Sequence, residues 1–329
     1  MYSGREPSAH AGADRGRRPD IRIGRIATRL ARAAGGPSRR DAVPAAEAIP
    51  EDVMVTAVEV AGARLHVIDE GARTDPPIVL LHAGIADTRS WDDVAPLLLD
   101  AGYRVVRYDM RGAGQTRSEE LPFSRVGDLF AVMAACGIKR AALVGNSMGG
   151  MTALDAAITE PDRVVAVVAV AAGLGGFDGG STPLEDELFA EMDRRDSAVP
   201  PDPDAIADID IQVWVDGPGQ PSDRVPAELR DLVRAMDTAG YQPGHDTGDV
   251  IRLDPPAAAR LHELRSPVLA VAGELDVSEV VVTARHLEAT APDARAVVWP
   301  DVAHMIGMEV PDRLAALIVE FLAPLPRWS

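Results

Sequence analysis

The sequence contains a single cysteine, Cys136, among 329 residues. One thiol excludes an intramolecular disulfide, a zinc site made of cysteines and an iron–sulfur cluster. Long hydrophobic runs are also missing, because the longest, Val164 to Ala172, has nine residues, whereas a membrane-spanning helix needs about 20. With 29 Gly and 26 Pro, the chain also lacks the composition of a disordered or fibrous protein. These absences leave a soluble globular protein as the expectation.

Basic residues are scarce as well. The chain has 33 Lys and Arg against 51 Asp and Glu, a net charge of −18. This balance does not supply the positive surface that a phosphate backbone requires, so we expect no nucleic-acid partner. Apolar residues make up 47% of the chain, which is enough to bury a large core. The length suits one large domain or two ordinary ones.

The first 50 residues have the opposite charge, with ten arginines and five acidic residues. This shift places a boundary near residue 50, and we expect residues 1–52 to form a basic, flexible extension. A helix at a membrane surface or a targeting peptide is the alternative, since apolar residues from Ile23 to Ala33 follow helical spacing. No apolar stretch follows the early arginines, as a secretory signal peptide requires, so we expect a cytoplasmic protein.

Beyond residue 52, short apolar runs typical of buried strands alternate with stretches of helical length. The expected strands are 53–60, 64–69, 78–82, 104–109, 141–145, 164–171, 268–273 and 296–299. The expected helices are about 91–101, 123–136, 148–160, 279–290 and 311–322. The first two strands are expected to form a hairpin around Ala61-Gly62. The alternation predicts an α/β fold with a mainly parallel, doubly wound sheet of about eight strands and helices on both faces.

Residues 174–256 interrupt this alternation, because they contain short helical patterns, many Pro and Gly and no clear strand. We expect them to form a helical lid inserted after the sixth strand, which leaves 53–173 and 257–329 as the core of the α/β domain. The segment holds 19 acidic and 6 basic residues. The negative electrostatic potential of this segment disfavours polyanions. We therefore expect small neutral or cationic ester substrates rather than acyl-CoA thioesters.

The sequence Gly145-Asn146-Ser147-Met148-Gly149 follows an expected strand and precedes an expected helix. This is the context of a nucleophile elbow, a sharp turn that exposes a serine hydroxyl and leaves no room for side chains on either flank. We therefore expect Ser147 to be a nucleophile and the backbone N–H of Met148 to bind an oxyanion. The second N–H of such an oxyanion hole is expected at Gly84, in the loop after the third strand. The alternative is a glycine-rich turn with an uninvolved serine.

A serine nucleophile needs a base, and the base needs an acid that orients it. Of the seven histidines, His304 lies on a loop after the last expected strand, at the sheet edge that also carries Ser147. We therefore expect His304 to be the base. His82 is expected to make a structural hydrogen bond in its loop, and His245 is expected in a solvated loop.

The expected acid is Asp276, which closely follows the strand at 268–273. Its place in the chain, between the nucleophile and the base, is the order that a nucleophile elbow predicts. Two alternatives stay open at this point. Asp276 is also suited to cap the next helix, and Glu274 is the nearest rival acid.

These segments resemble the motifs of the α/β-hydrolase superfamily, in its cofactor-free serine-esterase branch with a lid, over about residues 54–323. His82-Ala83-Gly84 resembles the oxyanion loop of the family, with Ala83 where glycine is usual. The segment 108–114 resembles the family's turn after the fourth strand, which implies that Asp109 has a structural rather than a catalytic role.

The resemblance implies acyl transfer to water without a cofactor or a metal ion. Ser147 would attack a carbonyl, His304 would move the proton, and Asp276 would orient the imidazole. The N–H groups of Gly84 and Met148 would bind the oxyanion. A serine nucleophile argues against relatives that use aspartate, such as haloalkane dehalogenases and epoxide hydrolases.

The same triad serves carboxylesterases, lactonases, carbon–carbon bond hydrolases and perhydrolases, so the family does not decide the substrate. We expect a hydrolase of small carboxylic esters. A lactonase or a carbon–carbon bond hydrolase is the main alternative, followed by a perhydrolase or a ligand-binding protein without turnover.

Met54, at the start of the resemblance, is itself a candidate initiator. A protein that begins at Met54 is expected to fold with an unchanged melting temperature and unchanged esterase kinetics. The reason is that the charge and composition of residues 1–53 give them little to bury against the sheet, and screened surface contacts contribute little. Calorimetry and ester hydrolysis, compared with the full chain, check this. Aggregation of the shortened protein, or a melting temperature lower by several degrees, would contradict it.

Overall fold

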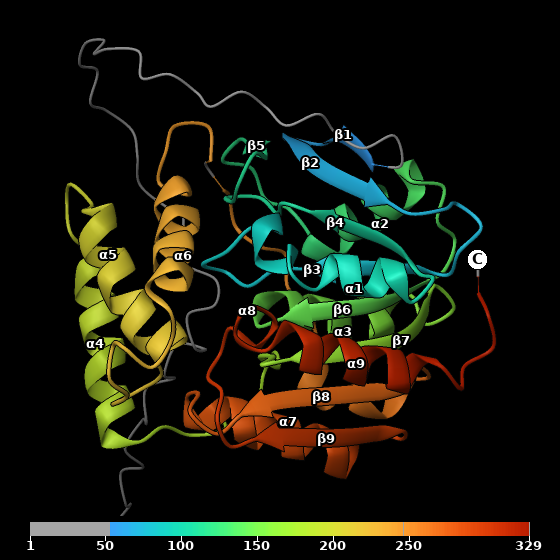
Figure 1. Cartoon of the computed structure of the whole chain (residues 1–329). Coiled ribbons are helices and arrows are strands. Elements are labelled where there is room, and N and C mark those ends of the chain that lie inside the picture. Colours follow the sequence, from blue (N-terminus) through green and yellow to red (C-terminus); the bar gives the residue numbers. More distant parts are fainter. Residues whose placement is uncertain (1–52, 246, 329) are drawn as a thin grey trace, which may run out of the picture.

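A twisted sheet forms the centre of the molecule (Figure 1), and the structure, a computed structural model, describes residues 53–245 and 247–328. The strand order is β1-β2-β4-β3-β6-β7-β8-β9, with β5 paired to β2. The strands are β1 (Val53–Val60), β2 (Ala63–Glu70), β3 (Pro77–Leu81), β4 (Arg104–Tyr108), β5 (Arg117–Ser118), β6 (Ala141–Asn146), β7 (Val164–Val170), β8 (Val268–Gly273) and β9 (Ala294–Trp299). The N-terminal extension expected at residues 1–52 lies outside the described residues.

The strand pairing confirms the mainly parallel sheet. β1 and β2 form the expected antiparallel hairpin, and Gly62 in its turn has φ 70°. β2 also pairs antiparallel with β4, and every further pair along the order, from β4 to β9, is parallel. The two-residue strand β5 is not predicted from the sequence. The sixth strand expected from the sequence, 164–171, is therefore β7 in the structure.

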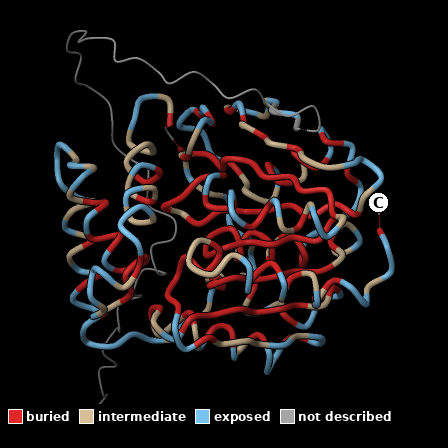
Figure 2. Tube along the Cα trace, viewed as in Figure 1, coloured by how far each residue is buried: buried red, intermediate tan, exposed pale blue. Residues whose placement is uncertain are grey.

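Helices cover both faces of the sheet (Figure 1). α1 (Ala95–Asp100) and α9 (Pro311–Leu322) pack together on one face, whereas α2 (Arg125–Ala135) and α3 (Met148–Thr159) contact each other on the opposite face. α7 (Ser278–Thr290) packs against β8 and β9. Because both faces are covered, β3, β4, β6 and β8 are buried along their whole length. Figure 2 shows this buried core running through the sheet.

The helix expected at 91–101 is shorter in the structure, where α1 begins at Ala95. Pro96 gives the reason, because proline lacks an N–H and fits only the first turn of a helix. The residues before it form a 3₁₀ turn instead, η1 (Thr88–Trp91), which the side chain of Asp87 caps.

Within the described part of the segment 174–256, three α-helices stand at the carboxyl ends of the parallel strands (Figure 1). They are α4 (Pro183–Asp196), α5 (Pro203–Asp210) and α6 (Ala227–Ala239). α5 continues directly into a π-helical turn, η2 (Ile211–Asp216), and contacts both α4 and α6. The remaining short elements are η3 (Ala257–Ala259), η4 (Leu261–Glu263) and α8 (Ile306–Glu309). None of the described helices combines the length and the apolar composition needed to cross a membrane.

A buried ion pair joins β2 to β4. Arg104 on β4 is 3% exposed, and its guanidinium donates to both carboxylate oxygens of Asp69 on β2, at 2.8 and 2.6 Å. A further N–H bond reaches the carbonyl oxygen of Cys136 at 2.8 Å. The hydrogen bond to Asp69 raises the pKa of Arg104, so the arginine keeps its charge although it is buried. The two charges therefore compensate each other inside the protein.

Replacing Asp69 with Asn is expected to lower the free energy of unfolding by about 3 kcal/mol, because Arg104 stays buried without its counter-charge. Urea unfolding of Asp69→Asn measures this. The control is Glu59→Gln, whose pair with Arg64 is exposed, with side-chain exposures of 74% and 68%, and it should cost less than about 1 kcal/mol. Equal losses in the two variants would contradict the assignment of stability to the buried pair.

Candidate active site

Ser147 sits in a strained turn between β6 and α3. Its φ and ψ are 55° and −115°, a conformation that L residues rarely adopt. The flanking glycines leave no room for side chains. A Cβ on Gly145 would lie 2.2 Å from the backbone of Gly149, and one on Gly149 would lie 2.3 Å from the carbonyl oxygen of Leu81. The N–H of Ser147 donates to Val170 at 2.8 Å, which holds the turn against β7.

His304 and Asp276 meet at the same edge of the sheet. Nδ1 of His304 lies 2.7 Å from Oδ2 of Asp276, and the two residues are 2% and 6% exposed. The other carboxylate oxygen accepts the N–H of Val277 at 2.7 Å. A carboxylate only accepts, so the proton of the ring is on Nδ1 and Nε2 is free to act as a base.

The backbone brings the two loops together. The N–H of Leu275 donates to Val302 at 3.1 Å, and a Cβ on Gly273 would lie 2.1 Å from the same carbonyl oxygen. The N-cap position of α7 is Val277, so Asp276 is not its N-cap. The rival acid, Glu274, is exposed.

Asn146 connects the turn at Ser147 to the loop of His304. Its side-chain N–H₂ donates to the carbonyl oxygen of His304 at 3.2 Å and to that of Val170 at 3.5 Å. Sequence reasoning gives this residue no role. The feature of the sequence that could have indicated its role is that Asn146 is a polar residue at the end of an otherwise apolar strand.

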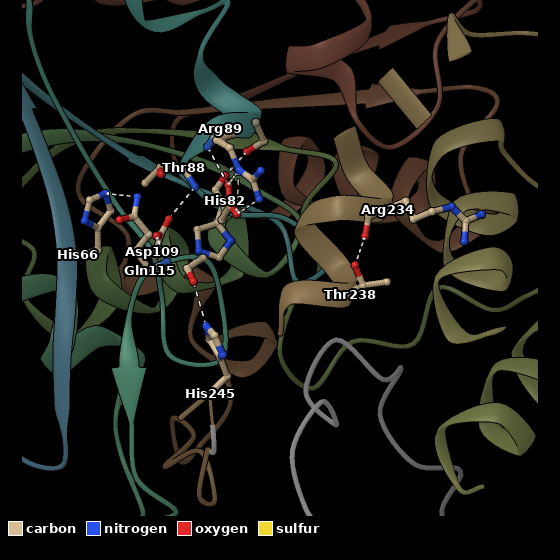
Figure 3. Close-up of polar contacts among 12 residues, drawn as sticks. His66, His82, Thr88, Arg89, Asp109, Gln115, Arg234, Thr238 and His245 are labelled. Atoms are coloured by element: carbon tan, nitrogen blue, oxygen red, sulfur yellow. Dashed lines mark hydrogen bonds and ion pairs between the residues drawn. The ribbon is translucent and has the colours of Figure 1, made fainter. Parts of the chain in front are cut away.

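The loop after β3 is held by His82 (Figure 3). Nδ1 of His82 donates to the carbonyl oxygen of Ala83 at 2.7 Å, and Nε2 accepts the N–H of Met110 at 2.8 Å. Both ring nitrogens are therefore occupied by structural bonds, as the sequence predicts. Gly84 follows in open space, since a Cβ on it would meet nothing within 4 Å.

Asp109 organises the turn after β4. Its carboxylate accepts the backbone N–H groups of Thr88 at 2.8 Å and Gln115 at 2.6 Å (Figure 3). These bonds give Asp109 the structural role that the sequence resemblance implies. The expectation for His245 is wrong, because it is 4% exposed. Its Nε2 lies 2.9 Å from the carbonyl oxygen of Gly114, in a turn that folds back onto this segment.

A tryptophan of the lid covers His304. The ring centroids of Trp214 and His304 are 4.7 Å apart, and Trp214 is 7% exposed. Sequence reasoning missed this residue. The sequence gives only a weak indication of its role, because Trp214 is the one tryptophan of the segment 174–256 and the chain has four in all.

A pocket lies beside His304 under the lid. Its empty volume is about 570 Å³, including the part open to solvent. Its lining is mostly apolar and includes Met151, Leu174, Phe177, Trp214, Val277 and Val280. Arg252, Glu279 and the imidazole of His304 are its polar members. This arrangement accommodates a small apolar group next to an imidazole.

Other nucleophiles and metal ligands are not arranged for chemistry in the described residues. Burial raises the pKa of Cys136 to about 11, so its thiol stays protonated and unreactive at neutral pH. No cluster of three or more His, Cys, Asp or Glu residues suited to a metal ion occurs within 53–245 and 247–328.

The chain is similar in sequence to known proteins. A protein-family model described as alpha/beta hydrolase fold matches residues 76–311. Rhodomycin D methylesterase DauP from Streptomyces sp. (strain C5) is 26% identical over 278 residues, which cover 75% of this chain and 91% of that protein.

Two solved structures share the fold. Carboxylesterase CesB from Bacillus subtilis is 18% identical with a TM-score of 0.63, over 84% of this chain and 93% of that one. The enol-lactonase from Burkholderia xenovorans LB400 is 24% identical with a TM-score of 0.63, over 81% of this chain and 99% of that one.

Asp276→Asn is expected to slow labelling of Ser147 by a fluorophosphonate by about 10³-fold or more, because an asparagine favours the wrong imidazole tautomer. Glu274→Gln should label at the wild-type rate, since Glu274 is exposed. Labelling rates measured by gel fluorescence compare the two variants. A wild-type rate in Asp276→Asn, with loss in Glu274→Gln, would show that Glu274 is the acid.

Proposed function

The chain belongs to the alpha/beta hydrolase family, and we propose that it is a serine hydrolase of small carboxylic esters that forms an acyl-enzyme on Ser147. The hydrogen bond of 2.7 Å between His304 and Asp276 is the observation that carries this proposal. A buried carboxylate that orients an imidazole next to a strained serine turn is the arrangement that activates a hydroxyl.

In the proposed reaction, Nε2 of His304 accepts the proton of Ser147 as the serine oxygen attacks the ester carbonyl. The carbonyl oxygen of the ester gains negative charge, and the backbone N–H groups of Met148 and Gly84 bind it. Met148 is the first residue of α3, so its N–H has no partner within the helix and lies at the positive end of the helix dipole.

The second half of the reaction uses the same groups. His304 returns its proton to the alcohol oxygen, which leaves as the carbon–oxygen bond breaks. Water then attacks the acyl-enzyme and gives a proton to His304. His304 passes this proton to the oxygen of Ser147 as the bond between that oxygen and the acyl carbon breaks, which releases the acid and free Ser147. Asp276 orients the imidazole and stabilises the imidazolium in both halves.

The pocket and the charge of the lid support a class of substrate. An apolar pocket next to His304 suits a small apolar acyl or alcohol group. The 19 acidic and 6 basic residues of 174–256 disfavour polyanions, so neutral or cationic esters are the proposed substrates. The relative named as a methylesterase supports ester cleavage. Lactones are internal esters, so they belong among the compounds to test.

Ser147→Ala is expected to lower kcat/KM for p-nitrophenyl esters by at least about 10⁴-fold while the melting temperature stays close to that of the wild type. The substrates to be compared are p-nitrophenyl esters from acetate to octanoate, simple lactones and an acyl-CoA, and kcat/KM is measured for each at low salt. The wild type should cleave neutral esters best and acyl-CoA worst.

The control is Ser266→Ala. Ser266 is also buried, but its hydroxyl donates to Val164 at 2.6 Å, just before β8 and at the opposite edge of the sheet. Wild-type rates in Ser147→Ala would overturn the proposal. A higher kcat/KM for acyl-CoA than for its neutral analogue would overturn the charge argument.

A further inference from the structure

Trp214 lies on an unusual piece of the lid, the π-helical turn η2, which continues α5 without a break. Such turns are rare and are frequently found at functional sites. The ring of Trp214 packs on that of His304, with the centroids 4.7 Å apart, and both residues line the pocket. The position of η2 therefore decides where one wall of the pocket stands relative to the imidazole.

The end of η2 is seated on the loop that carries the acid. The turn ends at Gly217, with φ 93°, where a Cβ would lie 2.3 Å from the carbonyl oxygen of Leu275. The backbone of the lid therefore touches the residue before Asp276 directly. Arg230 on α6 adds a hydrogen bond of 3.1 Å to the carboxylate of Asp216, the last residue of η2.

Arg224 joins the same turn to the loop that carries the base. Its Nε and Nη2 donate to the carbonyl oxygens of Asp216 and Val215, at 2.7 and 2.6 Å. Its Nη1 donates to the carboxylate of Glu309 at 2.5 Å. The other oxygen of Glu309 accepts the N–H of Ala303, which directly precedes the base in the chain, at 3.0 Å. One guanidinium thus connects the lid turn to the histidine loop through a single carboxylate.

The chemistry of this bridge suits arginine. The side chains of Arg224 and Glu309 are 13% and 5% exposed, so the pair is largely shielded from water. The last carbonyl groups of a helix have no partner within it, and a cation beside them also meets the negative end of the helix dipole. A guanidinium presents its N–H groups in a fixed fork, so it binds two carbonyl oxygens and a carboxylate at once, whereas an ammonium has one nitrogen.

We propose that Arg224 is a positioning residue that fixes η2 to the loop of His304, holds Trp214 as a wall of the pocket and so sets the length of acyl chain that is accepted. The proposal rests on the proposed function, because it takes the pocket to hold the acyl group of an ester. Arg224 lies outside the lining of the pocket, so it acts through the indole and not by contact with the substrate.

The first experiment measures the ratio of kcat/KM for p-nitrophenyl octanoate to that for the butyrate. Trp214→Ala removes the wall and is expected to raise the ratio about tenfold. Arg224→Met keeps a long side chain but makes none of the three hydrogen bonds, so the ratio should rise about threefold or more. A defect that merely disturbs the fold or the placement of His304 slows both esters and leaves the ratio unchanged, and this result would overturn the proposal.

Two further variants test whether Arg224 acts through Trp214. The double variant Trp214→Ala, Arg224→Met should have the ratio of Trp214→Ala alone, because the wall that Arg224 holds is already gone. Arg224→Lys should have a ratio between those of the wild type and Arg224→Met, since its ammonium pairs with Glu309 but does not bind both carbonyl groups. A ratio in the double variant equal to the product of the two single effects would contradict the proposal.

The matched control is Arg234→Met, the same substitution at another arginine of the lid. Arg234 on α6 (Figure 3) pairs with Asp208 on α5, so it joins two lid helices rather than η2 and the histidine loop. This variant should keep the wild-type ratio.

A second variant covers the case that Arg224→Met does not fold because Glu309 is left buried without its counter-charge. Arg224→Met combined with Glu309→Gln removes both charges together, and the amide oxygen still accepts the N–H of Ala303. The ratio should rise as in the single variant. A wild-type ratio in whichever of the two folds would overturn the proposal.

The second experiment does not depend on turnover. In full-length Ser147→Ala protein, quenching of the Trp214 emission by acrylamide is obtained as the difference between each protein and the same protein with Trp214→Phe. Trp214 is 7% exposed, so its quenching constant should be small in this background. Adding Arg224→Met is expected to raise the constant about twofold or more, because η2 is released, whereas adding Arg234→Met should leave it unchanged.

The two experiments separate the two claims. If the wild type cleaves no ester, the proposed function fails and the quenching measurement alone decides whether Arg224 holds Trp214. Unchanged quenching in Arg224→Met would overturn the positioning role even if every ester is cleaved.

Discussion

Three backbone segments touch at the turn of Ser147 without side chains between them, and the rest of the site depends on this contact. Gly149 approaches the end of β3 so closely that a Cβ would lie 2.3 Å from Leu81. A positive φ at a residue with a side chain costs about 1–3 kcal/mol, so it persists only where the surrounding packing leaves no alternative. That packing places the loop of Gly84, the start of α3 and the hydroxyl of Ser147 together at one edge of a parallel sheet.

The lid completes the site through polar contacts that are buried with it. Arg224 and Glu309 tie η2 to the loop of His304, and Trp214 covers the imidazole ring. Each contact removes charge or apolar surface from water, so the lid and the histidine loop hold each other in place. An acidic lid thus coexists with a mostly apolar pocket.

Much of the fold was predictable because its signals are local. The hairpin at Ala61-Gly62, the buried strands and the turn after β6 all follow from neighbouring residues, and the structure has them at nearly the expected bounds. One error has a local cause and the other a non-local one. Pro96 delays the start of α1, and His245 is buried because the chain folds back onto the turn at Gly114, a contact that no spacing rule contains.

The sequence by itself determined the α/β architecture, the glycine-flanked turn and the order of Ser147, Asp276 and His304, because alternation and turn chemistry are written in adjacent residues. Only the tertiary structure decided which residues surround them. Trp214 contacts a ring 90 positions away, and the lid helix α5 packs against α6. Contacts of this kind depend on how the lid helices pack against the sheet edge. A pattern of residue types along the chain does not specify that packing, because many acidic and apolar positions of the lid have the same local pattern.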